Sequence, residues 1–338
     1  SALAWGLDAR EITQGQAELS RALTLESKAS QATTSLPSKI LEFIPTNPFL
    51  DMTGARSTST LAVVIFSAFV GLAALGIRKK YQAEAELIQK LVDAAYAVTM
   101  RLVGMIIKFT PFGVLAIMSS TLASTDYGAI INLLKFILAS YTAIIVMFII
   151  HLLILSAFNY NPWIYTKKVW PVLTFAFMSR TSMGTIPLTV EAQTKKMGIS
   201  GAIANFSATF GTAIGQNGCA GIYPAMLAVM IAPSVGIDPF NVTFLLTVAL
   251  VTAVSSFGVA GVGGGATFAA LIVLSTLNLP VALAGFLISI EPLIDMGRTA
   301  LNVSDAFVAG AVTARVMGDV DMKVYNDRNI EIAKSQAQ

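Results

Sequence analysis

The chain has 338 residues, of which 55% are hydrophobic and only 12% are charged, and its mean hydropathy is +0.72. Soluble domains carry roughly 25% charged residues, so a water-soluble enzyme is disfavoured. The 22 basic and 19 acidic residues give a net charge of +3, which is too balanced for a nucleic-acid-binding protein. A single cysteine and a single histidine exclude an internal disulfide and a four-ligand zinc site.

The first 57 residues are polar, with charges in a helix-compatible pattern followed by Pro37, Pro45 and Pro48. The chain starts at Ser1 without a signal-peptide pattern. We therefore expect a segment of a longer protein, in which residues 1–57 form a polar connector outside the cytoplasm.

Seven apolar blocks follow this connector. A bilayer core of about 30 Å requires roughly 20 apolar residues per helical crossing, and Asp238 is the only charged residue between Met197 and Glu291. An all-α polytopic membrane protein is predicted. The blocks cover residues 59–77, 94–122, 129–155, 169–190, 199–232, 242–279 and 281–316.

Two of these blocks are predicted to be re-entrant helical hairpins. Lysine and arginine accumulate in cytoplasmic loops. Loops with and without basic residues fall on opposite sides of the membrane only if blocks 169–190 and 242–279 do not cross it, so that each enters and leaves on the same face. Breakers at 179–187 and a glycine cluster at 258–265 interrupt the two blocks. Such paired interruptions indicate the central site of a transporter, and residues 318–338 become a cytoplasmic tail.

The last long block carries a row of polar residues with helical spacing. Glu291, Asp295, Arg298, Thr299 and Asn302 lie mostly on one helical face. Intramembrane charges usually face a cavity or a partner, and alternating acids, bases and amides suit an amino acid zwitterion. The alternative is a structural ion pair between Asp295 and Arg298.

Two interrupted segments are further candidates. The hydroxyls of Thr181 and Ser182, with free N–H groups at half-helix ends, suit a substrate carboxylate, although they also suit a simple turn. The glycine-rich run 211–219 suits either an unwound cation site or tight helix packing. We expect Cys219 to be a small buried residue and His151 to be a hydrogen-bonded packing residue without a carboxylate nearby in sequence.

Catalysis has no signature in the sequence. The run 261–266 matches a dinucleotide fingerprint, but it lacks the required βαβ context. Hydrolase, zinc-protease and Walker motifs are missing from the sequence. We therefore predict a protein that is not an enzyme and that needs no cofactor besides a coupling ion.

Four motifs, at 179–187, 211–219, 256–263 and 295–303, resemble the dicarboxylate/amino acid:cation symporters, the family that includes the glutamate transporters. Within it, runs at 168–177, 216–221, 258–271 and 291–295 are most similar to the bacterial L-cystine uptake proteins. The resemblance implies a glutamate-transporter-like fold with two re-entrant hairpins and a broken helix, in a homotrimer of eight-helix protomers. Roughly the first three family helices would precede this segment.

The same resemblance divides the chain by function. Residues 58–122 would be scaffold helices for trimerisation, and residues 123–317 a transport domain that moves through the lipid bilayer in an elevator-type mechanism. The implied function is import of L-cystine by symport with a cation across a bacterial inner membrane. Symport of a dicarboxylate or another amino acid is an alternative, and a gated anion channel lined by Arg180 and Arg298, or a membrane enzyme, belongs to another class.

Substrate contacts are carried over by motif position. Asp295 would bind the ammonium group, Asn302 with Thr181 and Ser182 the carboxylate, and Arg298 a distal carboxylate. Glu291 or Gln216 would serve the second ammonium, while Cys219 would face the ligand. The full expected set is Arg180, Thr181, Ser182, Gln216, Cys219, Ala260, Gly261, Val262, Gly263 (the last four as the gate), Glu291, Asp295, Arg298, Thr299 and Asn302.

The coupling ion stays open between sodium and a proton. The family's aspartate four residues after Asn302 is Ala306 here, and Asp305 lies about 100° around the helix from that position, so we do not expect it to substitute. Sodium would then rely largely on backbone carbonyls, whereas a proton would bind an intramembrane carboxylate. The expected sodium set is Gly211, Ala213, Gly215, Asn217, Ser256, Phe257, Val259 and Asn302.

Overall fold

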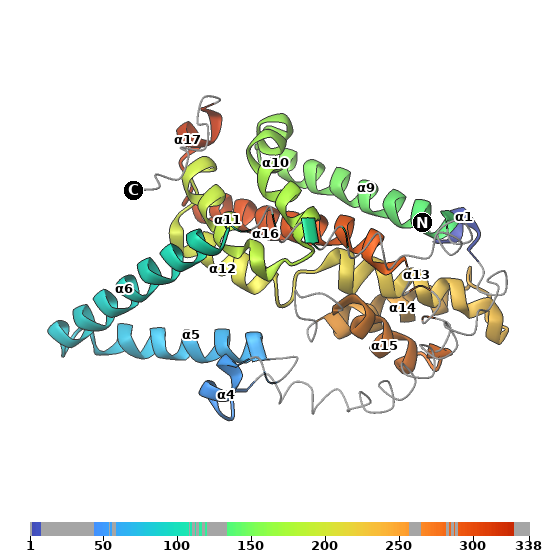
Figure 1. The fold of residues 1–338 in the computed structure, drawn as a ribbon, viewed down its shortest axis with the longest axis horizontal. Coiled ribbons are helices and arrows are strands. Elements are labelled where there is room, and N and C mark those ends of the chain that lie inside the picture. The colour runs from blue at the N-terminus through green and yellow to red at the C-terminus, as the bar shows by residue number, and fades with distance from the viewer. Residues whose placement is uncertain are drawn as a thin grey trace. The chain divides into compact units, whose positions relative to one another are not determined.

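The computed structural model describes residues 2–7, 44–53, 55, 59–107, 109, 112, 115–116, 119, 134–256, 265–281, 284, 287 and 290–327. Within these ranges the regular structure is helical, apart from an isolated bridge between Ile199 and Val320. The predicted all-helical architecture is therefore confirmed for this part of the chain. The chain divides into two compact units, residues 35–120 and residues 1–34 with 121–338, which are described separately (Figure 1).

Among the described residues, the unit 35–120 contains the short helix α4 (Pro48–Met52) and two longer helices, α5 (Ser59–Ile77) and α6 (Gln82–Ile107). The Asn47 side chain caps α4, and the Ser59 hydroxyl donates to Asp51 Oδ1 at 3.1 Å, which joins α4 to α5. A short turn joins α5 to α6, and both helices expose large apolar side chains such as Phe69 and Leu91. Such surfaces suit lipid or another subunit.

The larger unit is organised around α16 (Glu291–Met317), which packs against α9, α10, α12 and η4 (Figure 1). Its other elements are α1 (Ala2–Trp5), α9 (Leu134–Ala157), α10 (Pro162–Ser179), η2 (Met183–Thr185), α11 (Ile186–Glu191), η3 (Ala192–Lys196), α12 (Gly201–Gly211), η4 (Asn217–Ile222), α13 (Tyr223–Ile231), η5 (Ala232–Val235), α14 (Val242–Ser255), α15 (Gly265–Thr276) and α17 (Met322–Asn326).

Two segments among the described residues, Leu134–Ala157 and Asn217–Val235, are long and apolar enough to cross a membrane. On α9 the exposed side includes Ile145, Ile149 and Leu153, while the opposite side buries His151 and Leu155. An apolar helix that exposes isoleucine and leucine on one side and buries a polar residue on the other suits a boundary between lipid and protein.

The segment predicted as the first hairpin begins earlier than its apolar block. Asn161 caps α10 by accepting from the N–H groups of Trp163 and Ile164, and the helix ends where Arg180 adopts φ +55°. The chain then returns through α11 and η3 until Lys196 meets Lys168, whose ammonium donates to the Lys196 carbonyl at 2.6 Å. That the two helices dip into a membrane stays a prediction.

The other predicted interruptions are only partly described. After α12 ends at Gly211, the chain turns through residues 212–216 and continues as η4, a π-helical segment. The second predicted hairpin corresponds to α14 and α15, but its tip, residues 257–264, lies outside the described residues. The roles predicted for Phe257, Val259 and the gate residues 260–263 therefore concern residues outside the described part of the chain.

Candidate functional site

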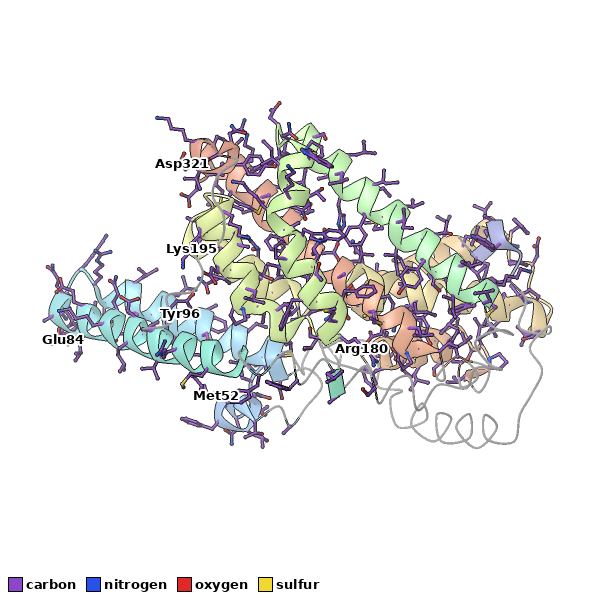
Figure 2. The ribbon with its side chains drawn as sticks, turned by 45° about the horizontal axis from the view of Figure 1, so that its top comes forward. Met52, Glu84, Tyr96, Arg180, Lys195 and Asp321 are labelled. Atoms are coloured by element: carbon purple, nitrogen blue, oxygen red, sulfur yellow. The ribbon has the colours of Figure 1, made fainter. Side chains whose placement is uncertain are left out.

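Four charged side chains meet where α10 ends and α16 begins. One of them, Arg180, is labelled in Figure 2. Arg298 Nη2 lies 2.5 Å from Glu291 Oε1 and 3.3 Å from Asp295 Oδ1. Arg180 Nε lies 3.0 Å from Asp295 Oδ2, and its Nη2 lies 3.5 Å from Glu291 Oε2. Two bases and two acids thus form one closed arrangement, which we call the charge cluster.

The members of the charge cluster differ in exposure. The side chains of Arg298, Asp295 and Glu291 are 1%, 4% and 9% exposed, whereas that of Arg180 is 19% exposed. Three members are fixed on α16, and the fourth extends from the left-handed turn after α10. Arg180 is therefore the member that can move away without unfolding a helix.

The Arg298 guanidinium is only partly satisfied. Its Cζ lies 4.2 Å from the ring centroid of the buried Tyr223, a cation–π geometry. Its Nε and Nη1 are buried and have no hydrogen-bond partner within the described residues. A buried unpaired donor costs about 1–3 kcal/mol, so these two nitrogens are available to donate to an anionic ligand.

The π-helical segment η4 closes one side of the cluster. The Gly218 N–H donates to Asn302 Oδ1 at 2.8 Å, and Asn302 Nδ2 lies 3.1 Å from Cys219 Sγ and 3.5 Å from Gln216 Oε1. Cys219 Sγ also lies 3.9 Å from Asp295 Oδ1. The predicted residues Gln216, Cys219 and Asn302 are therefore brought to the charge cluster.

The hairpin turn and Thr299 are placed differently. Thr181 Oγ1 accepts the Gly184 N–H at 3.2 Å, and the Ser182 carbonyl accepts the Thr185 hydroxyl at 2.6 Å. Both predicted hydroxyl residues follow Arg180, but the bonds described for them stay inside the turn. Thr299 is buried on α16, and no hydrogen bond within the described residues joins it to the charge cluster.

Four of the residues expected to bind sodium lie at or just after the end of α12: Gly211, Ala213, Gly215 and Asn217. Gly211 approaches α16 so closely that a Cβ on it would lie 3.1 Å from the Cβ of Ala306. Ala213 is buried, Gly215 lies against Gly211, and the Ser256 hydroxyl donates to the Ala253 carbonyl. A sodium site at these positions stays a prediction.

Sequence reasoning missed a second contact of a carboxylate, which lies between α9 and α16. His151 Nε2 lies 2.8 Å from Asp305 Oδ1, and Asp305 also accepts from the backbone N–H and the side-chain amide of Asn217, at 3.0 and 2.7 Å. His151 has a carboxylate partner, although none is near it in sequence. The available signal was that an ionisable group within an apolar helix needs a partner.

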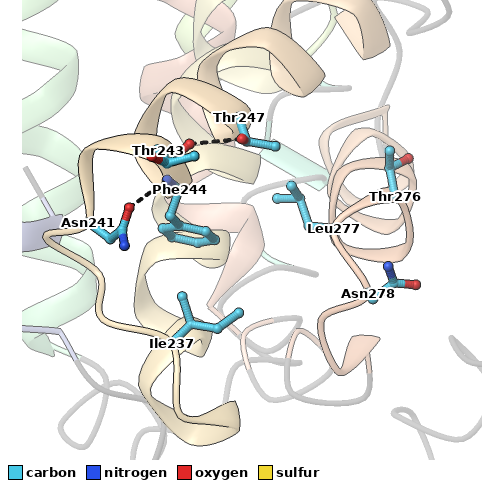
Figure 3. Close-up of a pocket in the computed structure, with 8 residues that line it drawn as sticks. All are labelled: Ile237, Asn241, Thr243, Phe244, Thr247, Thr276, Leu277 and Asn278. Carbon is cyan, nitrogen blue, oxygen red and sulfur yellow. Dashed lines mark hydrogen bonds between the residues drawn. The ribbon is translucent and has the colours of Figure 1, made fainter.

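A pocket of about 410 Å³ lies near the ends of α14 and α15 (Figure 3). Its lining is Ile237, Asn241, Thr243, Phe244, Thr247, Thr276, Leu277 and Asn278. None of these side chains is charged, so the pocket has no group that would neutralise an ionic ligand. The charge cluster remains the stronger candidate.

Buried opposite charges on facing helical elements, in a chain of long apolar helices, are typical of a membrane transporter. Residues 2–316 match the sodium:dicarboxylate symporter family, and the chain belongs to that family. It is 58% identical over 321 residues to the L-cystine uptake protein TcyP of Bacillus cereus, which covers 95% of this chain and 69% of that protein. It is 56% identical over 338 residues to TcyP of Bacillus subtilis, covering 100% of this chain and 73% of that protein.

Proposed function

We propose that the protein imports L-cystine by symport with a cation across a bacterial inner membrane, as a homotrimer in which residues 123–317 move past residues 58–122. Relatives that are 56–58% identical are named L-cystine uptake proteins. The observation that carries the proposal is the charge cluster, in which Arg298 keeps two unpartnered buried donors.

The chemistry of the cluster matches that of the substrate. L-cystine carries two ammonium and two carboxylate groups, and the cluster offers two carboxylates and two guanidinium groups. Asp295 and Glu291 take the two ammonium groups, Arg298 takes one carboxylate, and Asn302 with the turn at Thr181 and Ser182 takes the other. The Arg180 guanidinium now lies against Asp295 where an ammonium would bind, so the incoming substrate displaces it.

The competing functions fit the cluster less well. A dicarboxylate would leave Asp295 and Glu291 without new cationic partners, and buried unpaired carboxylates are costly. In an anion channel Arg180 and Arg298 would face the passing ion, whereas here both pair with carboxylates. Both observations favour a zwitterionic substrate.

The test is uptake of labelled L-cystine into proteoliposomes, with sodium and proton gradients imposed separately. We expect saturable uptake that unlabelled cystine blocks and that succinate and aspartate barely affect, with the substrate unchanged in mass. Equal competition by succinate or aspartate would reassign the substrate. A current that does not saturate would indicate a channel.

A matched pair of variants tests the site. Asp295→Asn removes the counter-charge of the substrate ammonium, and we expect it to abolish uptake in a protein that still elutes as folded. Asp319→Asn makes the same chemical change at an exposed position after α16, and uptake should be kept. Normal transport by Asp295→Asn would show that the ammonium binds elsewhere.

A further inference from the structure

We propose that His151, held against Asp305, is the site that binds a coupling proton during cystine uptake. The inference rests on the proposed symport and identifies the coupling ion and its binding residue. It begins from the buried contact between α9 and α16, at which His151 is 2% exposed and its Nε2 lies 2.8 Å from Asp305 Oδ1.

Both ring nitrogens of His151 have partners. Nδ1 lies 3.0 Å from Ser304 Oγ, and Ser304 Oγ lies 3.0 Å from the Tyr165 hydroxyl. These side chains form a hydrogen-bonded series, Tyr165–Ser304–His151–Asp305, that runs from α10 through α16 to α9 and back to α16. No member of the series is a backbone group, so each hydroxyl hydrogen is free to rotate.

This arrangement accepts a proton without creating an unpaired donor on the ring. In neutral His151, Nε2–H donates to Asp305 and Nδ1 accepts from the Ser304 hydroxyl. In protonated His151, Nδ1–H donates to Ser304 Oγ, and the Ser304 hydroxyl turns to donate to the Tyr165 oxygen. The Asp305 carboxylate faces the ring in both states and offsets the charge that the proton adds.

The groups that face His151 can be named for every element packed on α9. Asp305 faces it from α16 and Tyr165 lies one hydroxyl away on α10. Within the described residues, α1 has no titratable side chain, and the one on η4, Cys219, contacts Asp295 instead. Arg298 lies two helical turns before Asp305, about 10 Å along the axis, and is engaged in the charge cluster.

The η4 segment connects this histidine to the substrate site. Three consecutive residues of η4 contact α16: Asn217 bonds Asp305, Gly218 bonds Asn302, and Cys219 contacts both Asn302 and Asp295. When His151 is protonated, Asp305 is drawn towards the imidazolium, and its hold on Asn217 weakens. Because such coupling is reciprocal, cystine bound at Asn302 and Asp295 changes the proton affinity of His151.

A fixed ion pair that only joins α9 to α16 would have the same static geometry. It would not titrate in response to substrate, and it would not decide whether a proton gradient drives uptake. Two measurements therefore separate a proton site from a structural contact.

The first measurement uses the wild-type protein and needs no variant to fold. His151 is the only histidine in this chain, so ¹⁵N-histidine labelling reports its imidazole, with the His151→Gln spectrum giving the assignment. We expect the ¹⁵N signals of the ring to change with pH, and the midpoint of that change to shift when saturating L-cystine is added. A ring that does not titrate, or a midpoint that cystine leaves unchanged, would overturn the proposal.

The second measurement compares wild type, His151→Gln and Ser156→Ala in proteoliposomes. Ser156 is an exposed residue on the same helix and bonds only its own helix backbone in the described structure, so it is the matched control. Cystine exchange at equal pH on both sides measures transport itself, and net accumulation under a pH gradient measures proton coupling. A gradient of one pH unit supports about tenfold accumulation per coupled proton.

We expect wild type and Ser156→Ala to exchange cystine and to accumulate it about tenfold under that gradient. His151→Gln should still exchange cystine but should not accumulate it. Accumulation by His151→Gln equal to that of wild type would overturn the proton site. Absence of exchange in wild type would contradict cystine transport instead, and if His151→Gln alone fails to exchange, the titration of the wild-type histidine decides.

Discussion

The Arg180 side chain neutralises the two carboxylates of the charge cluster. Its guanidinium pairs with Asp295 and Glu291, the two carboxylates assigned to the substrate ammonium groups. Burial of two unpaired carboxylates is expensive, and Arg180 avoids this cost while no substrate is bound. We propose that substrate binding displaces this guanidinium, which then adds a contact to a substrate carboxylate beside those assigned above.

We expect Arg180→Ala to raise the KM for L-cystine. Charge-assisted hydrogen bonds contribute about 1.5–3 kcal/mol, so the increase should be about tenfold or more. Arg315→Ala, which removes an arginine about 25 Å along α16 from Arg298, should change KM little. Initial uptake rates over a range of cystine concentrations check this, and an unchanged KM in Arg180→Ala would contradict a substrate contact.

The sequence indicated which polar residues share one face of α16, but it did not indicate their partners on other helices. Glu291, Asp295, Arg298 and Asn302 follow helical spacing, so their common face could be predicted. The pairing of Arg180 with Asp295 and of His151 with Asp305 joins residues more than 100 positions apart, and no local periodicity carries such contacts.

At the scale of elements, η4 lies against α16 without a side chain between the two backbones. A Cβ on Gly218 would lie 2.7 Å from the Arg298 carbonyl oxygen, closer than side-chain carbons approach backbone atoms. Glycine is therefore required at this position for contact, not for backbone freedom. The contact keeps Asn302 and Cys219 in register with the charge cluster.

We expect Gly218→Ala to abolish or strongly reduce uptake, because the added methyl pushes η4 away from Arg298. Gly221→Ala adds the same methyl three residues later in η4, where nothing lies within 4 Å, and should retain uptake. Cystine uptake by the two variants at equal protein levels makes the comparison. Full activity of Gly218→Ala would show that the η4 contact is dispensable.

The lysines at the open end of the first predicted hairpin hold three segments together. Lys168 Nζ donates to the carbonyls of Lys196 and Val324, at 2.6 and 2.8 Å, and lies over the Tyr325 ring. Burial lowers the pKa of Lys168 and of Lys196. For Lys168, the nearby Asp327 carboxylate raises the pKa in part, and repulsion by Lys196 lowers it. The stability of this end of the unit is therefore expected to depend on pH.

We expect Lys168→Met to lower the free energy of unfolding by about 1–3 kcal/mol, because two carbonyls lose their donor. Lys167→Met, at an exposed neighbouring position, should stay within about 0.5 kcal/mol. Thermal unfolding in detergent measures both. Equal unfolding temperatures for the two variants would contradict the contact.

The unfolding temperature measured in this experiment should also depend on pH, and the lowered lysine pKa values fix the direction of the change. The lysine pKa values are lower in the folded state, so the unfolded state binds more protons below the ordinary value of 10.5. Stability therefore rises with pH as it approaches 10.5, and Lys168→Met should show a smaller rise. A wild-type unfolding temperature that falls with pH over this interval would contradict the lowered pKa values.

Helix existence was predictable at this scale, but helix ends were less so. The prolines and glycines at 179–187 and 211–219 indicated the interruptions after Ser179 and Gly211. The start of α10 at Pro162 was missed because Lys167 and Lys168 suggested a loop. Lys168 is instead buried against backbone carbonyls, which hydropathy does not detect.

At the scale of the whole molecule, the chain forms two compact units, 35–120 and the remainder. The proposed scaffold and transport domain were divided on family resemblance at residue 122, and movement between them is still a proposal. Apolar composition predicted the helical membrane class because charge is excluded from a bilayer core. The oligomeric state depends on contacts between exposed surfaces, and a pattern in a single sequence does not show which surfaces pair.

We expect the protein to be a homotrimer, held by the exposed apolar faces of the unit 35–120. Light scattering combined with size-exclusion chromatography in detergent should give a protein mass of three chains. Phe69→Lys and Leu72→Lys place charges on the exposed face of α5 and should reduce that mass. A monomer or dimer in the wild type would contradict the trimer.

The charge cluster also has an electrical consequence. Two arginines and two carboxylates sum to zero, and L-cystine as a double zwitterion adds no net charge. The membrane potential performs about 2.3 kcal/mol of work per elementary charge per 100 mV. It does no net work on this cluster, because the cluster has no net charge with or without substrate. If the proposed transport domain carries the cluster across the membrane, we expect the voltage to drive uptake through the coupling ion alone, and the return of the unloaded cluster to move no net charge.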